Sequence, residues 1–281
     1  MPLIAKDLCY SYPRTSSPTV DGFSLEAPAG RIVALCGAAR SGRSTVLSLL
    51  AGLNAPRSGA VAADGIATAS IEARGRTGLL LQNADEALFG LTVREDVMFA
   101  PLQLGVPPDE AGRRADYAMR AVGLDPPTFN GRSPFSLSGG QRRRAAVAAL
   151  IAMRPGYLLL DEPFVGLDPQ GRGEISTVIR IVATQSFGQH TGIVVALADL
   201  ELALSIADTI VILHGGRDVW SGSVAEYCAA PPDVASWGLY QPDLVALSTA
   251  LRSQGWGLPI DRPTASNLAV AVAAHVRMAR R

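Results

Sequence analysis

The sequence predicts an α/β fold in which a mostly parallel sheet carries helices on its faces. Strand-like and helix-like segments alternate along much of the 281-residue chain, which favours parallel strands joined by helices. Several strand-like segments are continuous apolar runs, as in strands that are buried on both faces. One of them, RIVALCG at 31–37, leads through a glycine-containing loop into a helical pattern.

Hydrophobic periodicity and turn residues predict the individual elements. Segments with a strand pattern lie at 3–12, 19–28, 31–37, 77–83, 157–163 and 192–199. Segments with a helical pattern lie at 46–53, 92–104, 108–124, 138–155, 173–185, 200–207, 244–254 and 266–279. Gly215 and Gly216 interrupt the stretch 209–222, which predicts a β-hairpin.

The pattern of apolar and turn-forming residues divides the chain into three parts. Helical patterns replace strand patterns at 91–155, which predicts a helical subdomain inserted into the α/β domain. From residue 230 onward, proline-containing breaks separate two short helical patterns. We therefore expect a main domain over 1–229 and a small C-terminal helical extension over 230–281.

Composition narrows the class of protein. Twenty-five basic residues balance twenty-five acidic ones, which gives no support to a nucleic-acid partner. The three cysteines have neither metal-ligand spacing nor the number needed for a disulfide framework, so we expect a reducing compartment. The sequence has no signal-peptide pattern and no apolar run of the roughly 18 residues that a membrane helix needs. We expect a cytosolic protein that reaches a membrane only through a partner.

The stretch GAARSGRST, at Gly37–Thr45, has nearly the spacing of a phosphate-binding loop. In such a loop, backbone N–H groups and the N-terminus of the following helix bind phosphate. The hydroxyl of Ser44 is placed to reach Mg²⁺. Arg43 stands where the pattern requires lysine, and this match alone leaves an ordinary glycine-rich turn open.

Asp161 and Glu162 end the buried run YLLLDEP. Adjacent carboxylates at the end of a buried strand are costly unless something pairs with them. Open α/β sheets bind their ligands at this carboxyl edge. A Mg²⁺ held near Asp161 and a water activated by Glu162 would explain both acids, whereas the alternative is a strand that ends in a polar turn.

LSGGQ, at Leu137–Gln141, opens a strong helical pattern. Ser138 and the two glycines, with the free N–H groups of a helix start, form a second potential anion site. Alone, the motif could equally be a helix cap with a flexible approach. One chain seldom needs two such helix ends for one nucleotide, which indicates a nucleotide held between two chains.

In this order the motifs resemble those of the nucleotide-binding subunits of ABC (ATP-binding cassette) transporters. The matching segments are the near-Walker A loop at 37–45, Gln82 after an apolar strand, LSGGQ, LLLDEP at 158–163 and GLD at 166–168. The resemblance covers residues 2–225 and implies a P-loop NTPase fold that binds ATP and Mg²⁺. The implied nucleotide-binding residues are Tyr12, Gly37, Ala38, Ala39, Arg40, Ser41, Gly42, Arg43, Ser44 and Thr45.

The resemblance also implies a role for each remaining motif. Tyr12 stacks on adenine, Glu162 polarises the attacking water, and Asp168 communicates across the dimer. Gln82 senses the transport subunit. The metal ligands are Ser44, Gln82 and Asp161. The signature residues that serve the nucleotide held by the partner chain are Ser138, Gly139, Gly140 and Gln141.

Two segments carry a narrower resemblance. The stretches 79–105 and 238–272 look like those of energy-coupling-factor (ECF) ATPases and the related cobalt-type importers. This implies a subunit that energises uptake of a vitamin or metal ion from the cytoplasmic face of the membrane. It also implies three partners, namely a second ABC ATPase paired through the C-terminal extension, a transmembrane coupling subunit and a substrate-binding membrane component.

Three positions depart from the family pattern. Ala198 replaces the histidine that normally bonds the γ-phosphate, and the three histidines of the chain, His190, His214 and His275, are out of register with it. Arg43 replaces lysine, and its broad planar fork should misplace the charge that a compact ammonium supplies. Arg40 stands where the family usually has glycine.

These changes fall on one nucleotide half-site, while the signature and the acidic motifs remain. The sequence therefore predicts a slow ATP site in one half of an unequal pair. A catalytically silent structural subunit and a non-ECF ABC ATPase remain as alternatives. Proteins of this class that act on DNA or in translation usually carry tandem cassettes or long coiled-coil inserts, and neither pattern is present here.

Overall fold

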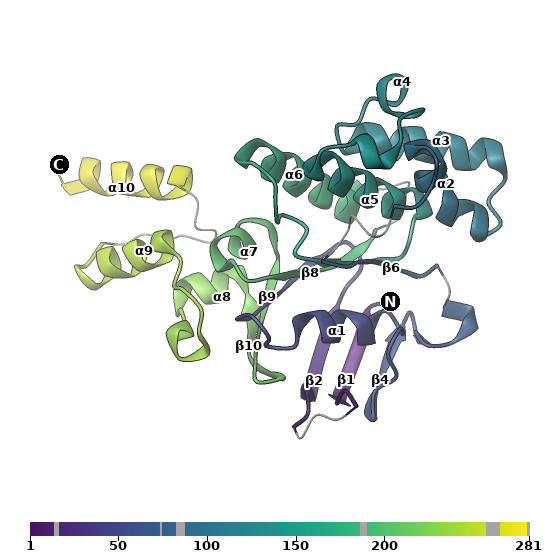
Figure 1. Cartoon of the computed structure of the whole chain (residues 1–281). Helices are drawn as coiled ribbons and strands as arrows, with labels where there is room; N and C mark the ends of the chain where they lie inside the picture. The colour runs from purple at the N-terminus through teal and green to yellow at the C-terminus, as the bar shows by residue number, and fades with distance from the viewer. Residues whose placement is uncertain (14–16, 74, 83–87, 186–189, 257–264, 280–281) are drawn as a thin grey trace.

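The computed structural model describes residues 1–13, 17–73, 75–82, 88–185, 190–256 and 265–279. Two sheets and the helices around them make up the fold (Figure 1), so the predicted α/β class is confirmed. Residues 83–87, within the predicted segment after Gln82, and residues 257–264, within the predicted tail, lie outside the described residues.

The larger sheet has the strand order β10-β9-β3-β8-β7-β6, and every neighbouring pair except β10–β9 is parallel. Its strands are β3 (Ile32–Cys36), β6 (Thr77–Leu80), β7 (Tyr157–Asp161), β8 (Gly192–Leu197), β9 (Thr209–His214) and β10 (Arg217–Ser223). The last two form the predicted hairpin around Gly215 and Gly216. Each strand predicted for this sheet is confirmed.

A second, antiparallel sheet has the order β2-β1-β4-β5. Its strands are β1 (Leu3–Tyr10), β2 (Val20–Ala27), β4 (Ser58–Ala63) and β5 (Ile66–Ala67). The sequence predicts the first two but not β4 and β5. The stretch SGAVAADGIA is dominated by alanine and glycine, which have low strand preference, so its pairing depends on the neighbouring β1.

The longer helices follow the predicted pattern, and only the short α4 and α8 were not expected. The helices are α1 (Arg43–Leu50), α2 (Val93–Gln103), α3 (Pro108–Ala121), α4 (Pro126–Phe129), α5 (Gly139–Met153), α6 (Pro169–Gln185), α7 (Leu200–Ile206), α8 (Val224–Ala229), α9 (Asp243–Ser253) and α10 (Ala265–Ala279). Short 3-10 turns lie at Ile71–Ala73, Pro134–Ser136 and Val234–Trp237.

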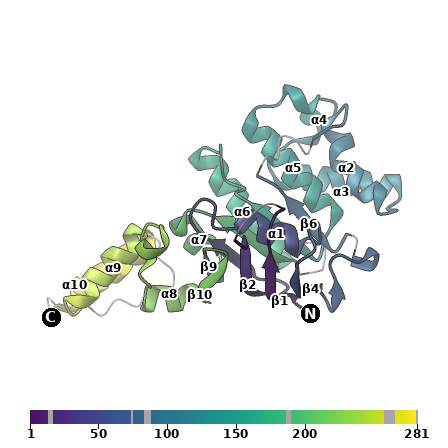
Figure 2. The ribbon, with the colours of Figure 1, turned by 60° about the horizontal axis from the view of Figure 1, so that its bottom comes forward.

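The central strands alternate between two hydrophobic cores. In β3, Val33 and Leu35 face a core shared with α1 and the antiparallel sheet, while Ile32, Ala34 and Cys36 face the core formed with the helices of the opposite side. Helix α1 thus lies between the two sheets, and α2, α3, α5 and α6 cover the other face, as Figures 1 and 2 show. Burial on both faces explains the continuous apolar runs in the sequence.

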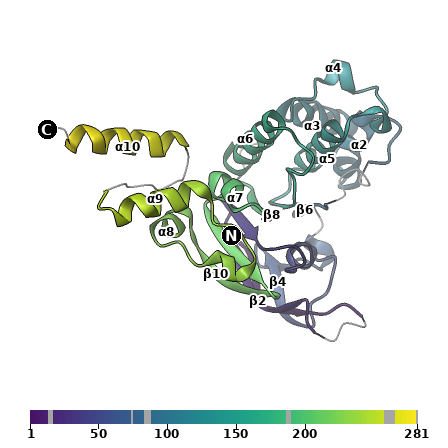
Figure 3. The same cartoon turned by 60° about the vertical axis from the view of Figure 1, so that its left-hand side comes forward.

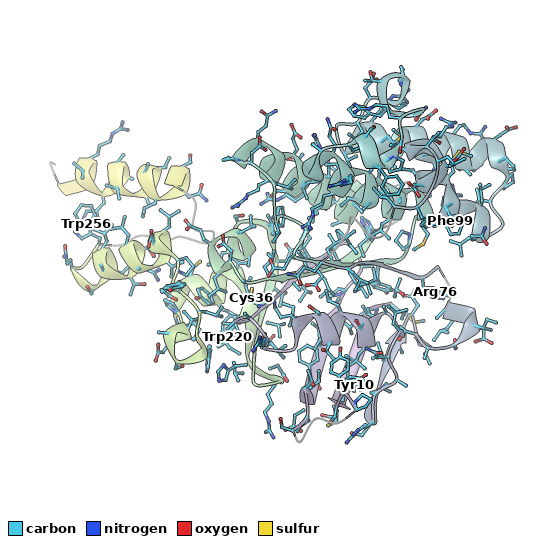
Figure 4. All side chains as sticks on the ribbon, viewed as in Figure 1. Tyr10, Cys36, Arg76, Phe99, Trp220 and Trp256 are labelled. Carbon is cyan, nitrogen blue, oxygen red and sulfur yellow. The ribbon has the colours of Figure 1, made fainter. Side chains whose placement is uncertain are left out.

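The two C-terminal helices project away from the sheets (Figure 3). They hold each other through a small cluster in which Trp256 stacks on His275, with ring centroids 4.2 Å apart. Figure 4 labels Trp256 beside these helices. Within the described ranges, we find no helix whose length and apolar character would let it cross a membrane.

Register brings three separate loops to one edge of the parallel sheet. Cys36, the last residue of β3, pairs with Leu197 of β8, and Asp161 of β7 pairs with Ala196. The residues that follow these strand ends therefore meet at the carboxyl edge, where α/β folds bind ligands.

Candidate functional site

The phosphate-binding loop connects β3 to α1, as the sequence predicts. Two glycines are fixed by close approach, because a Cβ on Gly37 would lie 2.5 Å from the Leu213 carbonyl oxygen and one on Gly42 would lie 2.8 Å from that of Thr19. Arg40 has a φ of 64°, which glycine adopts more easily than an L side chain. Residues of this loop and Thr19 line a cavity of about 230 Å³.

Arg43 points at the second acid of the predicted site. Its Nη2 donates to Glu162 Oε1 at 2.7 Å, and its Nη1 donates to the Ala38 carbonyl oxygen at 3.0 Å. The two side chains are only 12% and 14% exposed, so the pair is largely shielded from water. The structure thus joins the residue that replaces lysine to the candidate water-activating carboxylate.

Glu162 is held from several sides. Its φ is 48°, and its backbone N–H donates to the Ala196 carbonyl oxygen at 3.0 Å. Burial raises the pKa of its carboxyl above the ordinary value, and the nearby Asp161 acts in the same direction. The Arg43 charge and a hydrogen bond from the Ala198 backbone oppose this rise in pKa. Ala198 therefore lies against Glu162 but offers it only backbone.

Arg143 is a functional residue that the sequence analysis missed. This buried side chain on α5 donates to the carbonyl oxygens of Glu162 at 2.5 Å and of Gln82 at 2.9 Å. It thereby ties the signature helix to the ends of β6 and β7. The available signal was its spacing, because Arg143 precedes the buried Val147 and Ile151 at intervals of four residues on one helix face.

The donor set at this edge fits Mg²⁺, which prefers oxygen ligands and commonly binds through a carboxylate and substrate phosphates. Asp161 is 2% exposed, and among the described residues no hydrogen bond or ion pair engages its carboxylate. Ser44 is the second residue of helix α1, beside the loop, and the backbone of Gln82 is tied to that of Glu162 through Arg143. Ser44, Gln82 and Asp161 are thus the residues that would hold the ion.

Two buried polar atoms in the loop also fit a phosphate ligand. Ser41 Oγ and Arg43 Nε are buried and have no hydrogen-bond partner in the described part of the chain. Tyr12 lies close by, with its hydroxyl 3.3 Å from Thr45 Oγ1 and its ring edge-on to Tyr10. Its ring is partly exposed, as an aromatic that stacks on a base must be.

The signature motif lines a second cavity, which shares no residue with the cavity at the phosphate-binding loop. Ser138 caps α5 by accepting from the Gln141 N–H, and the Gln141 side chain accepts in return from the Ser138 N–H. A cavity of about 520 Å³ lies between this helix start and the loop that contains Asp168. Its lining residues are Ser138, Gly139, Gly140, Arg144, Gly166, Leu167, Asp168, Gln170, Gly171 and Glu174. Three of the four residues that the sequence assigns to the partner's nucleotide, Ser138, Gly139 and Gly140, thus line one open cavity together with Asp168, and Gln141 is not among its lining residues.

Comparison with known proteins agrees with these motifs. Residues 20–165 match the family model described as ABC transporter. The energy-coupling factor transporter ATP-binding protein EcfA2 of Symbiobacterium thermophilum is 36% identical over 97% of this chain and 96% of that relative. The cobalt import ATP-binding protein CbiO of Rhodobacter capsulatus is 37% identical over 91% of each chain.

The fold is also similar to that of a solved ABC transporter subunit. The structure of cbiO1 from Clostridium perfringens, described as part of the ABC transporter complex cbiONQ, superposes with a TM-score of 0.72 and 26% identity. The match covers 88% of this chain and 98% of that one. The chain therefore belongs to the ABC transporter family, among the ATP-binding proteins of the energy-coupling factor and cobalt-import type.

Proposed function

We propose that this chain is the slower half of a heterodimeric ATPase pair in an ECF-type importer. ATP binding and hydrolysis by the pair drive uptake of a vitamin or metal-ion micronutrient. The relatives named as ECF and cobalt-import ATP-binding proteins support the transport role, since the match extends over most of each chain.

One observation carries the assignment to the slower half. Arg43 replaces the loop lysine and is bonded to Glu162 at 2.7 Å, so the charge that should meet the phosphates engages the carboxylate that should meet the water. Ala198 adds only a backbone donor beside that carboxylate. By contrast, the Ser138 and Asp168 residues line an open cavity, which supports a role at the partner's nucleotide.

The same relatives support the proposed assembly. The partners in this proposal are a second ABC ATPase, a transmembrane coupling subunit and a substrate-binding membrane component, and the chain sits on the cytoplasmic face of the membrane. In the proposed half-site Tyr12 stacks on adenine, Gln82 and Asp161 bind Mg²⁺, and Glu162 positions water. The extension at 230–281 provides the dimerisation element, because its two helices project from the main domain.

A catalytically silent structural subunit is the second candidate, and the Arg43–Glu162 pair favours it too. The two candidates differ in residual activity, which the isolated chain reveals. Loss of one positioned charge-stabilising donor costs about 100-fold to 1,000-fold in rate, and two donors are altered here.

Steady-state ATP turnover by the purified chain is the test. We expect turnover far below the roughly 10 per second of an ordinary enzyme but above that of a Glu162→Gln control. Turnover near 10 per second contradicts the slow half-site, and turnover equal to the control favours the silent subunit.

A further inference from the structure

The guanidinium of Arg43 is shared between two acceptors. One terminal nitrogen donates to the Ala38 carbonyl oxygen in the phosphate-binding loop, and the other donates to Glu162 Oε1. The side chain therefore reaches from the start of α1 back to the loop and onward to β7. A lysine ammonium is a single compact charge and lacks the rigid fork that makes this double contact.

The backbone of Glu162 is held in place, so it cannot shift to keep the contact if Arg43 moves. The Glu162 N–H is bonded to Ala196, and the Glu162 carbonyl oxygen accepts from Arg143 at 2.5 Å. Rotation of the Glu162 side chain or of the Arg43 side chain is therefore what separates the two charges. Because both side chains are largely buried, separation leaves each charge without its partner unless a new one arrives.

A polyphosphate bound in the loop supplies such a partner. Its negative charge would lie beside the same guanidinium, which has one further buried donor, Nε, that is unpaired among the described residues. We propose that Arg43 is a positioning residue that holds Glu162, and that Glu162 and the diphosphate of a bound nucleotide compete for its guanidinium. This inference rests on the proposed ATP-binding function, and it makes nucleotide binding and release of Glu162 two halves of one equilibrium.

The test is the affinity of the full chain for ADP in excess EDTA, measured by isothermal titration calorimetry. ADP is the probe because it is not hydrolysed at this site, so a change in the rate of ATP hydrolysis cannot alter the measured affinity. EDTA removes Mg²⁺, so a change in Mg²⁺ binding cannot alter it either. Glu162→Gln keeps the shape of the side chain but removes the competing charge. We expect it to tighten ADP binding by about fivefold or more, the lower range of measured couplings between sites.

Two comparisons distinguish an effect of the Arg43–Glu162 contact from the general effect of removing one negative charge near the nucleotide. In an Arg43→Met background, Glu162→Gln should change ADP affinity by no more than about twofold, as for residues that do not interact. Asp199→Asn is the matched control. Asp199 lines a cavity with Ala38 and caps α7 by accepting from Leu202, which asparagine can also do. Removing this charge should likewise change affinity by no more than about twofold.

Thermal melts establish that each variant is folded, and Glu162→Ala, which also removes the carboxylate, replaces Glu162→Gln if that variant is not. Equal ADP affinity of wild type and Glu162→Gln overturns the inference, as does an equal gain in the Arg43→Met background. If the folded wild-type chain binds neither ADP nor ATP, the proposed ATP-binding function itself fails.

Discussion

In the proposed function, Arg43 limits what this half-site can do. A lysine at this position presents one ammonium to the phosphates, whereas the guanidinium here is split between Ala38 and Glu162. Ala198 compounds the change, because it lies against Glu162 with no side-chain donor. In the proposed function, these two changes, far apart in sequence, both weaken the half-site around Glu162.

Restoring the family residues should accelerate the site. Arg43→Lys with Ala198→His is expected to raise ATP turnover by about 100-fold or more, the value of one regained donor. The gain should exceed the combined gains of the single variants, since both side chains act on one phosphate and neighbouring groups couple. Turnover is measured in the assembled pair, with the partner's own site inactivated. A double variant no faster than wild type would show that Arg43 already serves the reaction or that the site is silent for another reason.

Sequence reasoning reached the identity of these residues but not their contacts. Motif order located Arg43, Glu162 and Ala198, and the shape of arginine predicted a misplaced charge. The partner of Arg43 could not be predicted, because Glu162 is 119 positions away and only the register of β3, β8 and β7 brings the two together. Arg143 was hidden for a similar reason, since its acceptors are backbone carbonyls with no sequence signature.

Helix α5 links the two functional faces of the chain. Its start carries the signature residues, and its buried Arg143 holds the ends of β6 and β7. A shift of the signature helix therefore pulls directly on Gln82 and Glu162.

Arg143→Met should destabilise the fold by about 2–4 kcal/mol, because it leaves two carbonyl oxygens without their charged donor. Urea unfolding followed by circular dichroism measures the change. Arg144→Met on the same helix is the control, since the partly exposed Arg144–Glu174 ion pair should contribute no more than about 1 kcal/mol. Equal costs for the two variants would contradict the bridging role of Arg143.

Elements with strong periodicity were predictable, and elements formed by context were not. The buried strands and the long helices follow from apolar runs and helical spacing. Strand β4 has one β-branched residue, Val61, and helix α8 is six residues long, so neither has a pattern that stands out in the sequence. Both form because a neighbouring element pairs with them or packs on them.

At the scale of the whole molecule, the proposed function gives the chain two half-sites of unequal quality. The loop face holds a nucleotide site in which Arg43 and Glu162 are paired, and the signature face holds an open cavity with its capped helix start intact. In the proposed pair with a complete partner, the signature face would contribute to the fast site and the loop face to the slow one.

Uptake of cargo by the complete transporter tests this inequality most directly, with Ser138→Arg and Glu162→Gln compared at equal levels of assembled complex. Ser138→Arg places a bulky side chain at the exposed start of α5, where the partner's nucleotide must dock, and should abolish uptake. Glu162→Gln removes a carboxylate from the site proposed to turn over slowly, and should leave a large fraction of uptake. Equal and complete loss in both variants would mean that the two sites are equivalent and that this chain is not the slower half.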